Sequence, residues 1–327
     1  MAHELSLPGD TSKVVMRFAP NPNGPPTLGH ARGIVINSEL VKKYKGKLIL
    51  RFDDTDPKTK KPMLEAYQWY QEDCRWLGFN PDEVVECSSR IDKYYEYAEQ
   101  LIKLGKAYIC ECSQDRFKQC RDTGRACQHR ERPAEENLTL WSKMASGECE
   151  EGELVLRIKT DLSAPNPAHR DWGAFRVLKA EHPKVGLKYS AWPMLDFAGA
   201  IEDKLLGVTH IIRGKDLSDS GKRQQYLYTH LGWIYPEVLH WGRIKVVEDV
   251  SENVEDSEDD EKVTKLSTSM IANAIKNGEY DGWDDPRLYT LMALRRRGIT
   301  PEAIRNLMLG LGLSESDIGV SMENLYA

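Results

Sequence analysis

The start of the chain limits its fold more than any other stretch. VVMRFA (residues 14–19) is typical of a buried strand, HARGIVINSELVKKY (30–44) has apolar residues at helical spacing, and KLILRFDD (47–54) is typical of a second strand. A strand–helix–strand unit of this kind has parallel strands and a right-handed crossover. The sequence therefore predicts an α/β protein built on a parallel sheet.

Later segments extend this pattern and interrupt it once. Helices are expected over 62–77 and 91–104, and strand and helix signals resume at 195–216 and 221–233. The stretch from about 110 to 188 mixes a short helix, a loop rich in Arg and Glu, and strand-like pieces, which indicates an insertion. We therefore expect the first half of a sheet domain, an inserted domain, the second half of the sheet domain and a helical region, over 1–109, 110–188, 189–250 and 251–327.

Composition argues against a protein that spans a membrane. The chain has 327 residues, of which 29% are charged, and it has no apolar run as long as a bilayer requires. The N-terminus has neither the basic flank nor the apolar core of a signal peptide, so we expect a cytoplasmic protein. The net charge of -6 does not point to a nucleic-acid partner. It does not exclude one, because binding depends on where Lys and Arg lie.

The turn between the first strand and the first helix is stiff. RFAPNPNGPPTLGHARG (17–33) is rich in proline and ends near the start of the helix. In a doubly wound sheet this loop faces the ligand crevice, and the helix behind it points its free N–H groups at a bound phosphate. Gly24 and Gly29 let the backbone approach a ligand, and His30 can donate to a phosphate or ribose oxygen. The alternative is a rigid surface turn with a capping histidine.

A second candidate phosphate site lies late in the chain. KLSTS (265–269) provides one lysine, Lys265, and three hydroxyl groups, and Ser269 is expected to open a helix. Two such loops at opposite ends of one sheet would hold a nucleotide triphosphate from both sides. The two loops together therefore predict a nucleotide site.

Several strings in this order resemble one family. TLGH (27–30) is similar to the HIGH motif and KLSTS to the KMSKS motif of class I aminoacyl-tRNA synthetases. The wider strings RFAPNPNGPPTLGH, LRFDDTDP, DFAGAIEDKLLGVTHIIRGKD and GWDDPRLYTLMALRRRGITPEAI resemble the catalytic region of glutamyl-tRNA synthetase of the archaeal type, which is close to glutaminyl-tRNA synthetase. The resemblance covers nearly the whole chain. It implies a Rossmann-like parallel sheet with an inserted acceptor-binding domain and a helical stem-contact region.

The resemblance also implies a reaction and the residues that perform it. In this family the α-carboxylate of the amino acid attacks the α-phosphate of ATP, with Mg²⁺ on the phosphates, and the acyl group then passes to the 3′ end of tRNA. The resemblance assigns catalysis to His30, Lys265 and Thr27, and ATP contacts to Pro20, Gly29, His30, Lys265, Ser267 and Ser269.

Two positions depart from the family motifs. The first histidine of HIGH is Thr27 here, and the second lysine of KMSKS is Thr268. Both family residues help to stabilise the pyrophosphate leaving group, so we expect His30 and Lys265 to carry more of that work.

Glutamate presents two carboxylates and one ammonium, so its pocket needs fixed cations and a carboxylate. Arg17 and Arg213 each end a predicted strand, and an arginine fork pairs with a carboxylate at two points. By resemblance these two arginines bind the carboxylates and Asp53 binds the ammonium. Glutamine needs no second cation, so Arg213 favours glutamate, although the tyrosine that the family often carries nearby is Leu195. The resemblance assigns substrate contacts also to Ala19, Asn21, Leu195 and Gly199.

Three cysteines and a histidine form a candidate metal site. Cys110-x-Cys112 and Cys127-x-His129 supply the ligand set of a closed structural zinc site. The seven cysteines are an odd number and are unevenly placed, which argues against a disulfide framework. Cys120 could replace one ligand, and unpaired buried thiols are the alternative. Some members of the family carry zinc in this insertion, so the resemblance favours a structural Zn²⁺.

Two dense basic stretches are candidates for RNA contact. They are RDTGRACQHRERP (121–133) and the triplet Arg295, Arg296 and Arg297. Phosphate contacts need clustered cations, and a charged helix face without a partner is the alternative for the triplet. We expect the insertion to hold the tRNA acceptor end and the C-terminal helices to contact the stem.

We therefore interpret the chain as a catalytic region that charges tRNA with glutamate. Its expected partners are ATP, glutamate and the acceptor arm of tRNA. The chain stops at ENLYA, where the family continues into anticodon-binding β-barrels, so we expect no anticodon contact and either a truncated chain or a shortened paralogue. The alternatives are glutaminyl-tRNA synthetase, a short paralogue that glutamylates a modified tRNA base, and a non-catalytic tRNA-binding relative.

Overall fold

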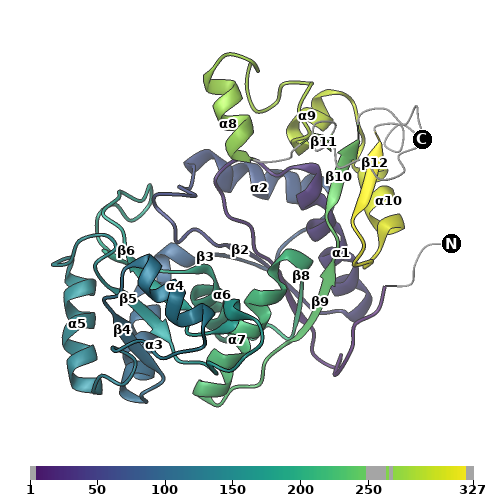
Figure 1. Cartoon of the computed structure of the whole chain (residues 1–327). Coiled ribbons are helices and arrows are strands. Elements are labelled where there is room, and N and C mark those ends of the chain that lie inside the picture. Colours follow the sequence, from purple (N-terminus) through teal and green to yellow (C-terminus); the bar gives the residue numbers. More distant parts are fainter. Residues whose placement is uncertain (1–4, 248–262, 265–267, 322–327) are drawn as a thin grey trace.

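A five-stranded parallel sheet lies at the centre of the computed structural model, which describes residues 5–247, 263–264 and 268–321 (Figure 1). The strands lie in the order β3–β2–β1–β8–β9, and every neighbouring pair is parallel. Their bounds are β1 (Val15–Phe18), β2 (Lys47–Phe52), β3 (Glu83–Glu86), β8 (His210–Gly214) and β9 (Glu237–Trp241). The order reverses between β1 and β8, where sheets of this kind bind their ligands. The predicted parallel α/β fold is confirmed.

Both faces of the central sheet are buried, because successive side chains of each strand point to opposite sides. Met16 and Leu50 belong to one apolar cluster, whereas their neighbours Val15 and Ile49 belong to another. The first cluster also includes residues of the helices α1 (Leu28–Tyr44), α2 (Leu64–Trp76), α9 (Leu291–Arg296) and α10 (Pro301–Leu311). This packing on both sides explains the continuous apolar character of the strands in the sequence.

An antiparallel sheet follows the first half of the parallel one in the chain. Its order is β4–β5–β6–β7, and the strands are β4 (Ala107–Cys110), β5 (Val155–Ile158), β6 (Gly173–Val177) and β7 (Ala191–Pro193). Two helices lie between β4 and β5 in sequence, α4 (Gln114–Asp122) and α5 (Ala134–Ser146). The strands of this sheet extend past both ends of the predicted insertion at 110–188, whose boundaries stay a prediction.

The antiparallel sheet shares its core with helices that precede it, follow it and lie between its strands in the chain. One apolar cluster contains residues of this sheet and of α3 (Ile91–Lys103), α5, α6 (Leu195–Leu205) and α7 (Ser218–Leu231). The insertion therefore packs directly on the helices between β7 and β9, as the lower left of Figure 1 shows.

A third, small sheet forms next to the N-terminal helix. The strand-like stretch VLHWGRIKVV divides into β9 and β10 (Ile244–Val247), and β10 pairs with β11 (Val263–Thr264) and β12 (Ile318–Ser321). The buried Arg32 of α1 donates from Nη1 to the carbonyl oxygen of Gly242, 2.8 Å away, and from Nη2 to that of Gly312, also at 2.8 Å. One guanidinium group thus fastens α1 to both segments that enter this sheet.

The C-terminal helical region closes over the first loop. Besides α10 it contains α8 (Thr268–Lys276) and α9 (Leu291–Arg296). Thr27 forms an isolated β-bridge with Thr290. On either side of it, Leu28 N donates to Tyr289 O and Leu291 N donates to Pro26 O, both at 2.9 Å. The loop before α1 is therefore held by residues from the far end of the sequence.

In the part of the chain that the structure describes, no helix has the length and apolar character needed to cross a membrane.

A buried carboxyl group joins α2 to α9. Asp73 is 1% exposed, and neither of its oxygens accepts a hydrogen bond from another described residue. Nη2 of Arg295 lies 3.2 Å from its Oδ1, and the same guanidinium stands over the Trp76 ring. Burial raises the pKa of Asp73 to about 7, although the Arg295 charge opposes this effect. Ionising Asp73 therefore costs folding free energy near neutral pH.

We predict that Asp73→Asn flattens the dependence of stability on pH. Because the folded pKa lies above the unfolded one, the protonated carboxyl stabilises the fold below about pH 4, and that contribution is lost as pH rises through 7. Between pH 5 and 8 the wild type should lose about 2–3 kcal/mol more than the variant. Urea unfolding at several pH values measures this difference. Glu65→Gln, an exposed change on the same helix, is the control, and equal slopes for Asp73→Asn and wild type would contradict the prediction.

Candidate active site

Four charged side chains form a buried network at the carboxyl edge of the central sheet. Asp203 of α6 lies between two arginines: its Oδ1 is 3.0 Å from Arg17 Nε and 2.6 Å from Arg51 Nη1. Arg51 also pairs with Asp53, at 2.7 Å between Nε and Oδ1. Burial opposes the charged form of Asp203, but Arg17 and Arg51 together hold its pKa below the usual range. The network fixes the ends of β1 and β2 to α6.

Two adjacent aspartates after β2 have different surroundings. Asp54 is fully buried and accepts hydrogen bonds from Tyr67 Oη at 2.6 Å and from Ser88 N and Oγ at 2.7 Å each. The Asp53 side chain retains 12% exposure. Of the two, Asp53 is therefore the one that a ligand can reach, and its site role stays a prediction.

Arg213 ends β8 and has neutral partners. Its Nη2 donates to Gln224 Oε1 at 3.1 Å and to Tyr235 Oη at 2.6 Å. Its Nε is buried and has no hydrogen-bond partner among the described residues, and none of their carboxylates lies within ion-pair distance. A buried guanidinium without a counter-ion is a candidate ligand for an anionic substrate group.

Two of the predicted substrate contacts belong to α6. Gly199 faces a narrow space, because a Cβ atom there would lie 3.3 Å from Gln224 Nε2 and 3.5 Å from Arg51 Nη2. Leu195 lies one turn earlier and is 46% exposed. Gly199 thus lies where α6 approaches Gln224 and Arg51, and the role of Leu195 stays a prediction.

The loop after β1 is attached to the loop after β2. Asp53 N donates to Pro20 O at 2.9 Å, and Asn21 Nδ2 donates to Asp53 O at the same distance. Ala19 precedes Pro20 directly and is partly exposed. The predicted contacts from this loop therefore share one edge of the sheet with Arg17 and Asp53.

His30 lies in the first turn of α1 and turns back on its N-cap. Its Nδ1 accepts a hydrogen bond from Thr27 N at 3.1 Å, so the ring proton resides on Nε2, which lies 3.4 Å from Tyr70 Oη. Burial lowers the pKa of His30 to about 4. Thr27 is 2% exposed, with its hydroxyl 3.1 Å from the same Nδ1. Thr27 therefore orients a neutral His30 that can donate from Nε2.

The KLSTS segment meets the first loop at its last residues. A Cβ atom on Gly24 would overlap the Thr268 side chain and come within 3.2 Å of the Trp283 ring. Ser269 lies in the exposed first turn of α8. Lys265 and Ser267, to which the sequence assigns ATP contacts, lie outside the described residues.

The predicted metal ligands come together in the insertion. Ligand atoms of Cys110, Cys112, Cys127 and His129 all lie within 4.8 Å of one another. The distance from Cys110 Sγ to Cys127 Sγ is 3.9 Å, and that from Cys112 Sγ to His129 Nδ1 is 3.5 Å. Zinc bonds of about 2.3 Å to sulfur and about 2.0 Å to nitrogen in a tetrahedron give about 3.8 Å and 3.5 Å for these separations. The donor set therefore fits a tetrahedral metal ion.

Comparison with known proteins matches this arrangement to one family. The model of the catalytic domain of class I tRNA synthetases of the E and Q type matches residues 13–327. The chain belongs to this family.

Curated relatives agree with this membership, and a solved structure has the same fold. The glutamate–tRNA ligase of Methanothrix thermoacetophila is 57% identical over 321 residues, which is 98% of this chain and 54% of that protein. The glutamate–tRNA ligase of Archaeoglobus fulgidus is 58% identical over 318 residues, which is 97% of this chain and 55% of that protein. The chain thus spans about half the length of these relatives. The crystal structure of a glutamate tRNA ligase from Elizabethkingia meningosepticum with its amino acid has a TM-score of 0.60 at 21% identity, over 97% of this chain and 68% of that one, which shows the shared fold.

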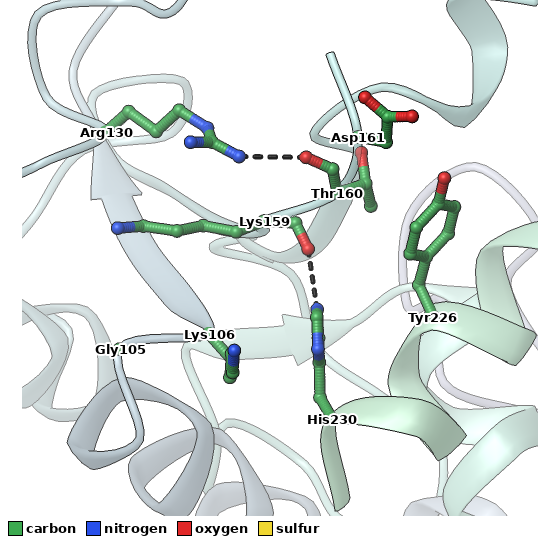
Figure 2. Close-up of a pocket in the computed structure, with 8 residues that line it drawn as sticks. All are labelled: Gly105, Lys106, Arg130, Lys159, Thr160, Asp161, Tyr226 and His230. Atoms are coloured by element: carbon green, nitrogen blue, oxygen red, sulfur yellow. Dashed lines mark hydrogen bonds between the residues drawn. The ribbon is translucent and has the colours of Figure 1, made fainter. Parts of the chain in front are cut away.

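A pocket of about 280 Å³ lies elsewhere in this synthetase catalytic domain (Figure 2). It is lined by Gly105, Lys106, Arg130, Lys159, Thr160, Asp161, Tyr226 and His230. His230 donates to Lys159 O at 2.6 Å, Arg130 pairs with Asp171 at 2.8 Å, and Lys159 Nζ pairs with Glu131 at 3.2 Å. Arg130 and Lys159 already have carboxylate partners, and the lining residues Lys106 and Asp161 carry opposite charges, so the pocket has little net charge to offer a polyanion.

The arginine triplet of this synthetase domain has partners within the chain. Arg295 faces Asp73, Arg296 Nη1 lies 3.2 Å from Asp284 Oδ2, and Arg297 Nη2 donates to Leu288 O at 3.2 Å. The side chains of Arg296 and Asp284 are each 54% exposed, and an ion pair at the surface is weak. Contact of the triplet with tRNA stays a prediction, and Arg296 is the member best placed for it.

Sequence reasoning missed several residues that build the site. Arg51 and Asp203 connect the predicted Arg17 to the predicted Asp53, while Gln224 and Tyr235 hold the predicted Arg213. The one sequence signal for Arg51 was an arginine within an otherwise apolar strand, two residues before Asp53.

Proposed function

We propose that this chain activates L-glutamate with ATP to form glutamyl-adenylate and pyrophosphate, and then transfers the glutamyl group to the 3′ end of tRNA. The observation that carries the proposal is Arg213, a buried arginine at the carboxyl end of β8 without a carboxylate partner among the described residues. A glutamate side chain would supply the missing counter-ion. The name of the relatives, glutamate–tRNA ligase, supports the same substrate.

The charges of the site suit both ends of glutamate. Arg213 would bind the side-chain carboxylate, Asp53 the ammonium group, and Arg17 would face the α-carboxylate from β1. A glutamine side chain is neutral, so an enzyme for glutamine would need no cation at this place. The presence of Arg213 therefore disfavours the alternative of a glutaminyl-tRNA synthetase. Leu195, where the family often has a tyrosine, is 46% exposed and would add an apolar side chain to the pocket.

The chemistry depends on position and charge more than on acid–base catalysis. The α-carboxylate displaces pyrophosphate from the α-phosphate in line, and the terminal ribose hydroxyl of tRNA then displaces AMP from the adenylate. Because His30 has a pKa of about 4, it stays neutral at physiological pH and donates a hydrogen bond from Nε2. Lys265, and magnesium bound to the phosphates, would neutralise the charge of the leaving group.

Arg213→Ala should abolish glutamate activation and leave ATP binding nearly unchanged. Removing the cation leaves a substrate carboxylate unpaired in a buried site, which costs about 3 kcal/mol or more. Glutamate-dependent exchange of pyrophosphate into ATP, measured with and without tRNA, gives the glutamate KM. Arg213→Lys keeps the charge without the planar fork, so its glutamate KM should lie between those of the wild type and Arg213→Ala. An unchanged glutamate KM in Arg213→Ala would show that Arg213 does not bind the substrate carboxylate.

We also propose that Cys110, Cys112, Cys127 and His129 hold one structural zinc ion. The geometry of the donors supports this proposal, and Glu111 Oε2, 3.2 Å from His129 Nε2, would orient the imidazole. Such an ion would cross-link β4 to the segment after α4 and supply no step of the reaction.

Elemental analysis of metal-replete protein should find one zinc per chain. Cys127→Ser should lose the metal and lower the melting temperature, because one of four ligands is removed. Cys120→Ser is the matched control, since Cys120 lies in the same small apolar cluster but outside the ligand group. Retention of zinc by Cys127→Ser, or its loss from Cys120→Ser, would show that the ligand set is wrong.

The proposed RNA partner is the acceptor arm of tRNA, held by the insertion and by the C-terminal helices around Arg296. We expect charging of a minihelix that contains only the acceptor arm, with weak binding that falls steeply with salt. Charging should not depend on the anticodon, and Arg296→Gln should reduce the salt slope while glutamate activation stays intact. A large loss of charging after a change in the anticodon alone would contradict this proposal.

A further inference from the structure

Gln224 closes a triangle of hydrogen bonds around Arg213. Arg213 Nη2 donates to Gln224 Oε1 at 3.1 Å and to Tyr235 Oη at 2.6 Å, and Tyr235 Oη donates to Gln224 Oε1 at 2.8 Å. Gln224 is 4% exposed. Because Arg213 offers only donors, the amide must face it with its oxygen. The orientation of both the amide and the guanidinium is therefore fixed.

The other two arginines of the site are neutralised. Arg17 and Arg51 share Asp203, and Arg51 also pairs with Asp53. The charge of Arg213 reaches Asp203, but the oxygens of that carboxylate already bind Arg17 and Arg51. The three arginines and two aspartates therefore leave one positive charge, and it resides on Arg213.

The groups around Arg213 that could change this balance are few. Tyr235 belongs to the triangle and is uncharged, and His240 of β9 has its pKa lowered by burial and by the Arg213 charge, so it is neutral too. Among the described residues around Arg213, position 224 is thus where exchanging one atom would supply a counter-ion. Replacing the amide nitrogen of Gln224 with an oxygen would place a carboxylate beside Arg213.

We propose that Gln224 is a specificity-determining residue that holds Arg213 in place without cancelling its charge. The proposal rests on the proposed function, in which that charge selects an amino acid with a side-chain carboxylate. A carboxylate at 224 would have the same size as the amide and would pair with Arg213 from within the protein. The pocket would then have no net charge to recognise a glutamate side chain, and it would accept a neutral amide more readily.

The test compares two isosteric changes on neighbouring positions of α7. Gln224→Glu places the carboxylate beside Arg213, and Gln225→Glu adds the same charge on the exposed face of the helix. Equilibrium binding of glutamate and of glutamine to the whole chain is measured by calorimetry. Gln224→Glu should weaken glutamate about 100-fold and glutamine far less, so the ratio of the two Kd values should fall at least about tenfold. Gln225→Glu should keep the wild-type ratio.

Further variants separate charge from packing. Gln224→Met removes the acceptor without adding charge, so it should keep the preference for glutamate even if both ligands bind less well. If Gln224→Glu does not unfold cooperatively, Gln224→Asp delivers the same charge with less bulk and carries the same expectation. An unchanged ratio in the carboxylate variants, or an equal fall of the ratio in Gln224→Met, would overturn the proposal.

Binding and catalysis distinguish this inference from the function on which it rests. A wild-type chain that prefers glutamate in calorimetry but shows no glutamate-dependent pyrophosphate exchange would remove the proposed activity and leave the role of Gln224 intact. Exchange activity together with an unchanged Kd ratio in Gln224→Glu would support the proposed activity and remove the role of Gln224. Absence of glutamate binding to the wild type would remove both.

Discussion

The buried contact of Asp203 with Arg17 and Arg51 is the interaction on which the site depends. It joins three elements far apart in sequence, because Arg17 belongs to β1, Arg51 to β2 and Asp203 to α6. Burying these ions is expensive and brings little net stability, but removing one member would strand the others without a counter-ion. The network is therefore better understood as a device that fixes geometry. It sets where β1 and β2 end and hence where their loops begin.

The buried arginines of this chain have different kinds of partner. Arg51 is wholly committed to two aspartates, whereas Arg213 is held by an amide and a phenol and keeps its charge. Arg32 is a third type, since it is buried and binds carbonyl oxygens that end α10 and precede β10. Arg51 is thus a counter-ion, Arg32 fixes two backbone segments, and Arg213 is the proposed ligand of a substrate carboxylate. The partners of these three identical side chains distinguish their roles.

These partners set the limit of what the sequence could predict. The apolar strands, the helix after the proline-rich turn and the pair Cys110-x-Cys112 and Cys127-x-His129 are local patterns, so the parallel sheet was predicted, and so was a metal cluster whose four ligand atoms do converge. The motif resemblance pointed to Arg213 and Asp53. Asp203 and Gln224 lie inside helices with no local mark of function, and their roles arise from packing across the sheet.

The bridge between Thr27 and Thr290 affects how the molecule is made. Thr27 caps the helix that carries His30, and its neighbours Pro26 and Leu28 bond to the backbone around Thr290. During synthesis the first loop leaves the ribosome long before Thr290 is added, so the parallel strands can pair while the loop before α1 still lacks its final hydrogen bonds. Contacts so distant along the chain form late in folding. The part of the site nearest the N-terminus is therefore among the last to be completed, and an incomplete chain would contain the turn without its finished shape.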